Sequence, residues 1–468
     1  MTGSGKAPCM TLRSELVPRS VRPAPAPLPL HRFLFEFVQN PLRIVPEAAY
    51  NEPIVVRKRY TGGKVAWITD PKMIEEILVR NTAATCKSDL EKRVLGRSIG
   101  DGVLTSDGAL WRWQRRTMAP LFRAQDIQAY VPAMAQAASE QAAQWRREGS
   151  GWKRIDRDMT GATFAIIART MLGGSEFPET GTIKTATERY LSRVSWEIAY
   201  TVLGLPRWMP HPGSAQMHRA AKQLRGSAQS VIARRRAELA RGGGEGRDLL
   251  SRLLAARDPE SGEPMSDIQL VDNLLTLLEA GHETTAKALT WTLYLLARAP
   301  EWQAALRAEV TQVAGSKDIT AAHLPSLPLL HQVLKESMRL FPPAPSLGRL
   351  FTEPFKIGGE QFDPGDLVIF PIFCIHRHRR LWVNPDAFDP ERFTPEREKS
   401  YPRTQYMPFG AGPRICIGNA FAMTEAATLL ATFVRAAQFD WDGKHEPEPV
   451  SRITLRPRGG MRLLVSLL

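Results

Sequence analysis

The sequence predicts a mainly α-helical protein with small β-sheets (class α+β), built as a single large domain. Helical periodicity of apolar residues dominates from about residue 71 to residue 340. After residue 340 the pattern changes to short alternating runs that are separated by turn residues. No internal repeat and no clean linker divides the two parts. With 468 residues, of which 43% are hydrophobic and 24% charged, the chain has the composition of a soluble globular protein.

The first elements in chain order are a lead-in and a hairpin. Residues 1–48 are rich in Pro and Ala at their start, and we expect them to be partly disordered. Residues 54–68, "IVVRKRYTGGKVAWI", predict two short strands around a Gly-Gly turn. A hairpin of this size cannot hold a core of its own. We therefore expect it to belong to one folded domain that spans residues 49–468.

The helical part has one clear start and stop. Ser266 and Gln269 form the sequence pattern of a capping box, and Pro300 follows the apolar-periodic run, so we expect a helix of about eight turns between them. The proline-rich segment 203–214 is expected to be a loop. Near the C-terminus, residues 453–465, "ITLRPRGGMRLLV", predict a pair of strands.

Charge and cysteine content limit the function classes. Lys and Arg outnumber Asp and Glu by 62 to 48, a net charge of +14, which favours acidic partners. No helix-turn-helix, zinc-finger or base-stacking signature accompanies the charge, so we do not expect nucleic acid binding. The four cysteines are scattered and form neither a disulfide framework nor a zinc pattern, which fits a reducing compartment. The longest apolar segment, 268–297, carries four charged residues, so we expect no membrane anchor and a cytoplasmic location.

One cysteine has an unusual setting. Cys416 lies in "FGAGPRICIG", between a glycine-rich loop and a predicted helix. A helix N-terminus stabilises a thiolate, and Gly410, Gly412 and Gly418 would let a flat cofactor approach the backbone. Taken alone, a single cysteine in a turn is more often a buried structural residue.

The whole segment resembles the haem-binding signature of the cytochrome P-450 family, which overturns that simpler interpretation. Phe409, Gly412, Arg414, Cys416 and Gly418 match the signature. The resemblance implies the cytochrome P-450 fold, haem b (iron protoporphyrin IX) as cofactor, and Cys416 as the axial ligand of the haem iron. It also implies that Phe409 and Arg414 belong to the haem-binding residues.

Two further motifs match the same family. "LKESMRLFPPAP" supplies Glu336 and Arg339, and "FDPERF" supplies Arg392. The resemblance implies a charge network among these three residues that supports the cysteine loop. "AGHETT", in the middle of the long helix, corresponds to the segment that crosses the distal face of the haem. There the resemblance implies an acid–alcohol pair for proton delivery, Glu283 and Thr284.

A fourth motif concerns the haem propionates. In "WRWQRR", Trp111 and Arg115 are four residues apart and therefore share one helix face. In the family the corresponding pair binds a propionate, and Arg349 stands where many members have another propionate donor. We expect Arg414, in preference to His376, to be a further propionate donor. The resemblance covers nearly the whole chain from about residue 50.

The resemblance implies a haem-thiolate monooxygenase that inserts one atom of O2 into a lipophilic small molecule. No flavin or nicotinamide domain is apparent, so the electrons, ultimately from NAD(P)H, are expected to arrive through a separate acidic donor of the ferredoxin or flavodoxin type. The clusters "WRWQRR" and "HRHRR" would suit such a donor. We expect a soluble bacterial-type monomer. A peroxygenase, isomerase or dehydratase, or a non-catalytic haem sensor, stays open as an alternative. The substrate itself is not predicted.

Overall fold

The computed structural model describes residues 16–468, except residues 173–178, 207 and 243–247. Its α-helices are α1 (Leu30–Gln39), α2 (Pro71–Glu75), α3 (Asp89–Ile99), α4 (Gly108–Met118), α5 (Ala124–Gln128), α6 (Val131–Glu148), α7 (Ile155–Leu172), α8 (Glu179–Leu191), α9 (Val194–Val202), α10 (Ser214–Ala240), α11 (Leu249–Ala255), α12 (Asp267–Arg298), α13 (Pro300–Ala314), α14 (Pro328–Leu340), α15 (Ile372–Ile375), α16 (Pro395–Glu398) and α17 (Asn419–Ala436). Its strands are β1 (Ile54–Lys58), β2 (Lys64–Ile68), β3 (Thr85–Lys87), β4 (Gly151–Arg154), β5 (Leu347–Phe351), β6 (Phe355–Ile357), β7 (Glu360–Phe362), β8 (Leu367–Phe370), β9 (Ala437–Asp440), β10 (Pro449–Ser451), β11 (Leu455–Pro457) and β12 (Arg462–Leu467).

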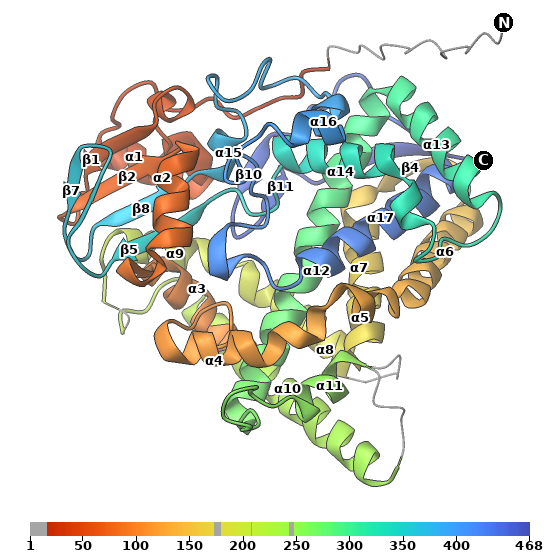
Figure 1. Cartoon of the computed structure of the whole chain (residues 1–468), viewed down its shortest axis with the longest axis horizontal. Coiled ribbons are helices and arrows are strands. Elements are labelled where there is room, and N and C mark those ends of the chain that lie inside the picture. The colour runs from red at the N-terminus through yellow and green to blue at the C-terminus, as the bar shows by residue number, and fades with distance from the viewer. Residues whose placement is uncertain (1–15, 173–178, 207, 243–247) are drawn as a thin grey trace, which may run out of the picture.

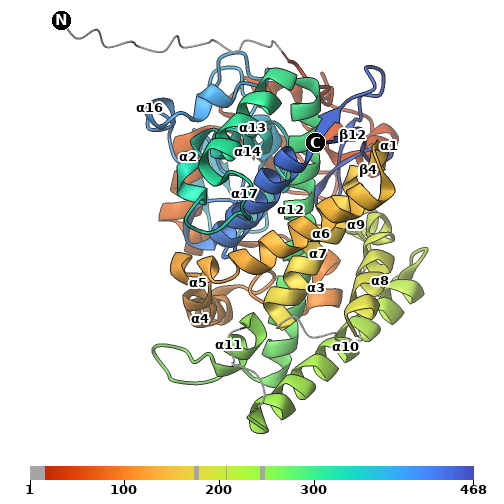
Figure 2. The same ribbon diagram turned by 90° about the vertical axis from the view of Figure 1, so that its right-hand side faces the viewer.

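The long helix α12 runs through the middle of the molecule, with α7 and α17 beside it and α6 packed in turn against those two helices (Figures 1 and 2). It begins at Ser266, whose side chain accepts a hydrogen bond from the Gln269 backbone, and the reciprocal bond completes the predicted capping box. Most of its residues are buried, because α7, α10, α14 and α17 pack around it. The predicted helix start and stop are thus confirmed.

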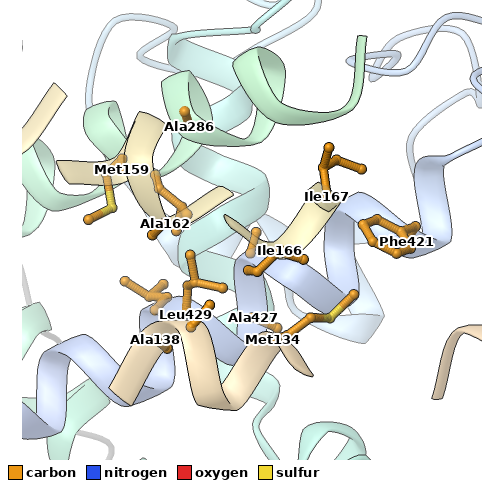
Figure 3. Packing of buried hydrophobic residues seen from close by; sticks show 14 of the residues in the cluster. Met134, Ala138, Met159, Ala162, Ile166, Ile167, Ala286, Phe421, Ala427 and Leu429 are labelled. Atoms are coloured by element: carbon orange, nitrogen blue, oxygen red, sulfur yellow. The ribbon is translucent and has the colours of Figure 1, made fainter. Parts of the chain in front are cut away.

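The main hydrophobic core lies where these central helices meet (Figure 3). Burial of so many aliphatic side chains is the chief source of stability for a helical domain. The labelled side chains come from α6, α7, α12 and α17: Met134, Ala138, Met159, Ala162, Ile166, Ile167, Ala286, Phe421, Ala427 and Leu429.

The largest sheet lies at one end of the molecule, on the left of Figure 1, and has the strand order β1-β2-β8-β5-β3. The predicted hairpin β1–β2 is confirmed, with Ile54 opposite Ile68. β2 then pairs in parallel with β8, so the hairpin shares a sheet with strands from the C-terminal third of the chain. This shared sheet explains why the N-terminal strands do not form a separate domain.

One feature differs from the sequence-based expectation. The strands near residues 453–465 do not pair with each other: β11 pairs with β10, whereas β12 pairs with β4 and β9. The sequence shows only that strands exist, because pairing partners are set by tertiary packing. Within the lead-in of residues 1–48, residues 30–39 form α1, and Leu16 and Val21 are buried in the main core. Residues 1–15 lie outside the described part.

Candidate active site

The Cys416 loop is shaped by two glycines with positive φ, Gly410 at 77° and Gly412 at 70°. A Cβ atom on Gly412 would overlap the carbonyl oxygen of Leu78, so only glycine fits this close approach. The Cys416 backbone N–H donates to the carbonyl oxygen of Phe409 at 2.9 Å, which closes the turn. α17 begins three residues after Cys416. The predicted loop–helix junction is therefore present, with the cysteine directly before the helix.

The Cys416 side chain is exposed only toward a large internal cavity, whose wall also contains Phe409. Burial within the protein raises the pKa of the Cys416 thiol, while the Gly418 backbone N–H and the Arg115 guanidinium act in the opposite direction. Coordination by a metal ion deprotonates such a thiol outright.

Four predicted haem-binding side chains line the same cavity: Trp111, Arg115, Arg349 and Arg414. The Arg414 guanidinium lies over the Trp111 ring, 4.2 Å from its centroid, and donates to Asp107 at 2.6 Å and to the Ser106 carbonyl at 3.0 Å. Burial lowers the pKa of both Arg115 and Arg414. The arrangement concentrates positive charge beside Cys416, in a region where an anionic group would find donors.

Arg349 lies on β5 and is buried, with its Nη1 donating to the Gly348 carbonyl at 2.7 Å. On the neighbouring strand β3, Lys87 is its register partner and also lines the cavity. Lys87 forms an ion pair of 3.0 Å with Glu91, and its burial lowers its pKa. Lys87 was not predicted from the sequence, because a single lysine does not form a recognisable motif. His376, by contrast, is buried outside the cavity wall, stacked on Tyr406.

Glu283 and Thr284 line the cavity from the middle of α12. The Thr284 hydroxyl donates to the Ala280 carbonyl at 2.9 Å, the backbone-directed bond of a helical threonine. One turn earlier, a Cβ atom on Gly281 would lie 2.9 Å from Ile167, so the glycine permits close packing of α7. His282 is buried, and its Nδ1 donates a hydrogen bond to the Leu278 carbonyl at 2.8 Å. His282 is therefore structural, not solvent-facing.

Glu283 is anchored by the C-terminal hairpin, which consists of β10, β11 and the turn between them, and this contact was not predicted from the sequence. Its Oε1 accepts a hydrogen bond from the Thr454 hydroxyl at 3.0 Å and forms an ion pair with Arg456. Thr454 itself lines the cavity. The partners are separated from Glu283 by more than 170 residues of chain, so no local sequence signal could reveal them. Glu283 thus connects α12 with a cavity-lining turn near the C-terminus.

Glu336, Arg339 and Arg392 are brought together where α14 packs against residues 390–393. Arg339 donates to both Glu336 oxygens, at 2.7 and 2.8 Å, and both side chains are fully buried. The Arg392 Nε lies 3.4 Å from Glu336. The Asp389 backbone N–H adds a further donor at 2.8 Å. The terminal N–H groups of Arg339 and Arg392 also donate to backbone carbonyls in residues 376–387. These are the carbonyls of His376, Val383, Asn384, Pro385 and Ala387.

The cavity has a volume of about 1240 Å³ and a mostly apolar lining. Exposed lining residues such as Lys58, Tyr60 and Gly62 show that it reaches the surface beside the β1–β2 hairpin. Ser346 and Leu347, which follow α14, also contribute. The walls come from segments far apart in sequence, among them α3, α4, α12, residues 343–350, the cysteine loop and residues 451–454.

Two carboxyl groups beside this cavity, one fully buried and one half-buried, were not singled out by the sequence. Glu425 on α17 is fully buried, and neither of its oxygens has a well-formed hydrogen bond among the described residues. Burial raises the pKa of Glu425 to about 8, with the Thr285 hydroxyl partly offsetting the effect. Glu279 on α12 lines the cavity, and burial raises its pKa to about 8 as well. Both residues stand in apolar helices, where a lone Glu gives no functional signal.

Comparisons with known proteins agree with this geometry. Residues 23–464 match the family model described as Cytochrome P450. The chain is 31% identical to cyclooctatin synthase of Streptomyces melanosporofaciens, over 94% of this chain and 93% of that protein. It is 32% identical to a cytokinin hydroxylase of Arabidopsis thaliana, over 85% and 78% of the two chains. The crystal structure of the cytochrome P450DA heme domain superposes with a TM-score of 0.79 at 26% identity, over 96% of this chain and 98% of that chain.

The chain belongs to the cytochrome P450 family, and its relatives identify it as a cytochrome P450 monooxygenase. Family membership implies haem, O2, reducing equivalents and a redox partner. In the part of the chain that the structure describes, no helix has both the length and the apolarity needed to cross a membrane.

Proposed function

We propose that this monooxygenase holds haem b through the Cys416 sulfur and hydroxylates or epoxidises a lipophilic small molecule. The observation that carries the proposal is one mostly apolar cavity whose wall contains Cys416, Glu283 and Thr284 together. An apolar cavity with a few polar groups is the typical binding site of such a substrate. One atom of O2 enters a C–H or C=C bond, and the other leaves as water with two electrons and two protons.

The residues around Cys416 fit haem. The Cys416 thiol in the cavity wall would hold the iron, and Trp111, Arg115, Arg349 and Arg414 would offer the cationic and N–H donors that the two propionates require. The tight glycine turn leaves the backbone close to the cavity. When bound, a thiolate-ligated haem supplies the activation of O2.

We assign proton delivery to Thr284 and Glu283. The Thr284 hydroxyl stands at the cavity wall and can hold a water molecule or donate a proton there. Glu283 is bonded to Thr454 and Arg456, so the route from solvent to Thr284 is proposed to pass the C-terminal hairpin.

For electrons we propose an acidic donor of the ferredoxin or flavodoxin type that is reduced by NAD(P)H. The net charge of +14 supports an acidic partner. On α4, Arg112 is exposed and forms no ion pair with any residue that the structure describes, while Arg115 of the same helix lines the cavity. The "HRHRR" segment is less suited than expected, because His376, Arg377 and His378 are buried.

The test is the CO difference spectrum of the dithionite-reduced protein. A strongly red-shifted Soret band is expected for the wild type and for Cys86→Ser, a control on β3 outside the cysteine loop. Cys416→Ser is expected to lose the band while staying folded. A wild-type band in Cys416→Ser would refute the ligand assignment, and turnover with peroxide but never with a surrogate reductase would favour a peroxygenase.

A further inference from the structure

Glu279 has no part in the oxygen chemistry proposed above, yet it stands in the cavity wall one turn before Glu283. Its neighbours come from two other helices. Ser98 on α3 and Tyr190 on α8 are both fully buried, and the Tyr190 hydroxyl donates to the Val94 carbonyl at 2.6 Å. A carboxyl group in an apolar cavity is costly unless it is hydrogen-bonded. The hydrogen-bond partners of Glu279 therefore decide what this group can do.

The hydrogen bonds around Glu279 leave one of its acceptors unused. The Ser98 hydroxyl lies 3.0 Å from the Leu95 carbonyl and 3.3 Å from Glu279 Oε2. A hydroxyl has a single hydrogen, and the shorter contact places it on the Leu95 carbonyl, so the Ser98 oxygen can accept from a protonated Glu279. The second oxygen, Oε1, is shielded from solvent and has no partner among the described residues.

The charges around Glu279 favour its neutral form. Arg93 and Arg97, the basic residues of α3 on this side, form ion pairs with Glu197. Burial, together with the negative charge of Glu283, raises the pKa of Glu279 to about 8. At neutral pH the group is then a carboxylic acid. Its O–H is bonded to Ser98, and its other oxygen, Oε1, has no partner among the described residues.

We propose that Glu279 anchors a hydroxyl group of the substrate, so that the preferred substrate is a neutral, largely hydrocarbon molecule that carries an alcohol. This inference rests on the proposed function and adds the substrate class. An alcohol supplies the missing donor to Oε1, and the terminal torsion of a glutamate is soft enough to turn either oxygen toward the cavity. An ammonium group is disfavoured, because Arg57, Lys58 and Arg59 line the mouth of the cavity.

The experiment compares ligands that share one skeleton in spectral titrations of the purified haem protein. The probes are cyclododecanol, methoxycyclododecane, cyclododecane and cyclododecyltrimethylammonium. We expect the alcohol to bind roughly 10-fold more tightly than the ether and the hydrocarbon, the worth of one buried hydrogen bond. Equal affinities for the alcohol and the hydrocarbon, or tightest binding of the ammonium compound, would overturn the proposal.

Substitutions of Glu279 test whether this residue binds the hydroxyl group of the ligand. Glu279→Leu should abolish the preference for the alcohol and should bind cyclododecane at least as well as the wild type. Glu279→Gln should keep most of the preference, because its amide can donate to Ser98 and still present a carbonyl oxygen. Thr276→Val is the matched control: Thr276 lines the cavity on the same helix, but its hydroxyl is bonded to the Asp272 carbonyl at 2.7 Å. It should keep the full preference.

Failure of this inference can be told from failure of the proposed function. Each variant is first examined for the CO difference band, which reports the thiolate-ligated haem irrespective of substrate. Protein without the band would refute the proposed function and, with it, the inference. Protein with the band in which Glu279→Leu retains the alcohol preference, or in which Glu279→Gln loses it as fully as Glu279→Leu, would refute only the neutral hydroxyl anchor.

Discussion

Three carboxyl groups, those of Glu336 in the network on α14 and of Glu425 and Glu279 beside the substrate cavity, have hydrogen-bond partners to very different degrees. Glu336 and Glu425 are fully buried, and Glu279 is half-buried. Glu336 is contacted by the guanidinium of Arg339 in two hydrogen bonds, by Arg392, and by a backbone N–H. Among the described residues, Glu425 has no well-formed hydrogen bond, and Glu279 is close to one serine hydroxyl. No cation faces either of them among the groups that set their pKa.

This difference separates a fixed scaffold from a site that keeps binding capacity. A buried charge with complete partners holds its surroundings in one arrangement, and removing any partner is costly. A buried carboxyl group without partners lowers the stability of the empty protein, but it remains able to bond a ligand or pass a proton. Opposite responses to mutation in the two regions would establish the distinction.

The largest effect is expected for Glu336→Ala. Its loss leaves two buried guanidinium groups, those of Arg339 and Arg392, without their carboxylate. We expect the free energy of unfolding to fall by ~3–5 kcal/mol and the yield of haem protein to drop sharply. Chemical denaturation followed by circular dichroism measures the change. Glu396→Ala, at an exposed position on α16, is the control and should leave stability unchanged. A small effect of Glu336→Ala would mean that the network is not a scaffold.

For Glu425→Gln we expect the free energy of unfolding to rise instead of fall. In the unfolded chain this carboxyl group ionises near the ordinary glutamate pKa of 4.5, whereas burial raises its pKa to about 8 in the folded protein. Between these values the unfolded chain has released a proton that the folded protein retains, so the free energy of unfolding of the wild type falls as the pH rises. A glutamine at this position does not titrate, so the free energy of unfolding of the variant does not fall in this way.

The gain of Glu425→Gln over the wild type should therefore grow from about pH 5 to about pH 8, reach the order of a few kcal/mol, and then level off. Denaturation of both proteins across this pH range measures it. A stability difference that is independent of pH would show that Glu425 is ionised in the folded protein and paired in some other way.

The sequence predicts the scaffold better than the cavity. Glu336, Arg339 and Arg392 belong to motifs, and the Gly-rich loop at Cys416 is fixed by local backbone requirements at Gly412, so both are visible in a single sequence. The same holds for the α12 capping box, which depends on two residues three positions apart.

What the sequence could not predict depends on contacts between distant segments. Glu283 meets Arg456 only because the C-terminal hairpin folds back on α12, and β12 pairs with β4 across some 300 residues of chain. A lone Lys87 or Glu279 has no local signature, since its role follows from the cavity that other segments complete. Charge patterns mislead for the same reason: three of the five "HRHRR" residues are buried.

Thr284→Ala tests whether the hydroxyl in the cavity wall takes part in proton delivery. The hydroxyl is the polar group of α12 that can manage protons at the cavity wall, so its removal should uncouple electron use from product formation. We expect peroxide release per electron to rise roughly 10-fold, which is less than the ~10²–10⁴-fold that a positioned proton donor contributes to a rate. Peroxide and NADH are measured together with a surrogate reductase. Thr284→Ser keeps a hydroxyl and should recover most of the coupling, and unchanged coupling in Thr284→Ala would exclude this role.

The smallest effect is expected at the surface, for Arg112→Glu. Arg112 is exposed on α4, the helix whose Arg115 faces the cavity beside Cys416, so an acidic donor that docks there would meet a reversed charge. We expect the donor-supported rate to fall about threefold at low salt and the difference to shrink as salt screens the charges. The peroxide-supported rate should not change, because it needs no donor. Arg379→Glu, in the "HRHRR" segment beside Glu47, is the matched control. An equal loss in both variants would place the donor elsewhere and leave only a general effect of net charge.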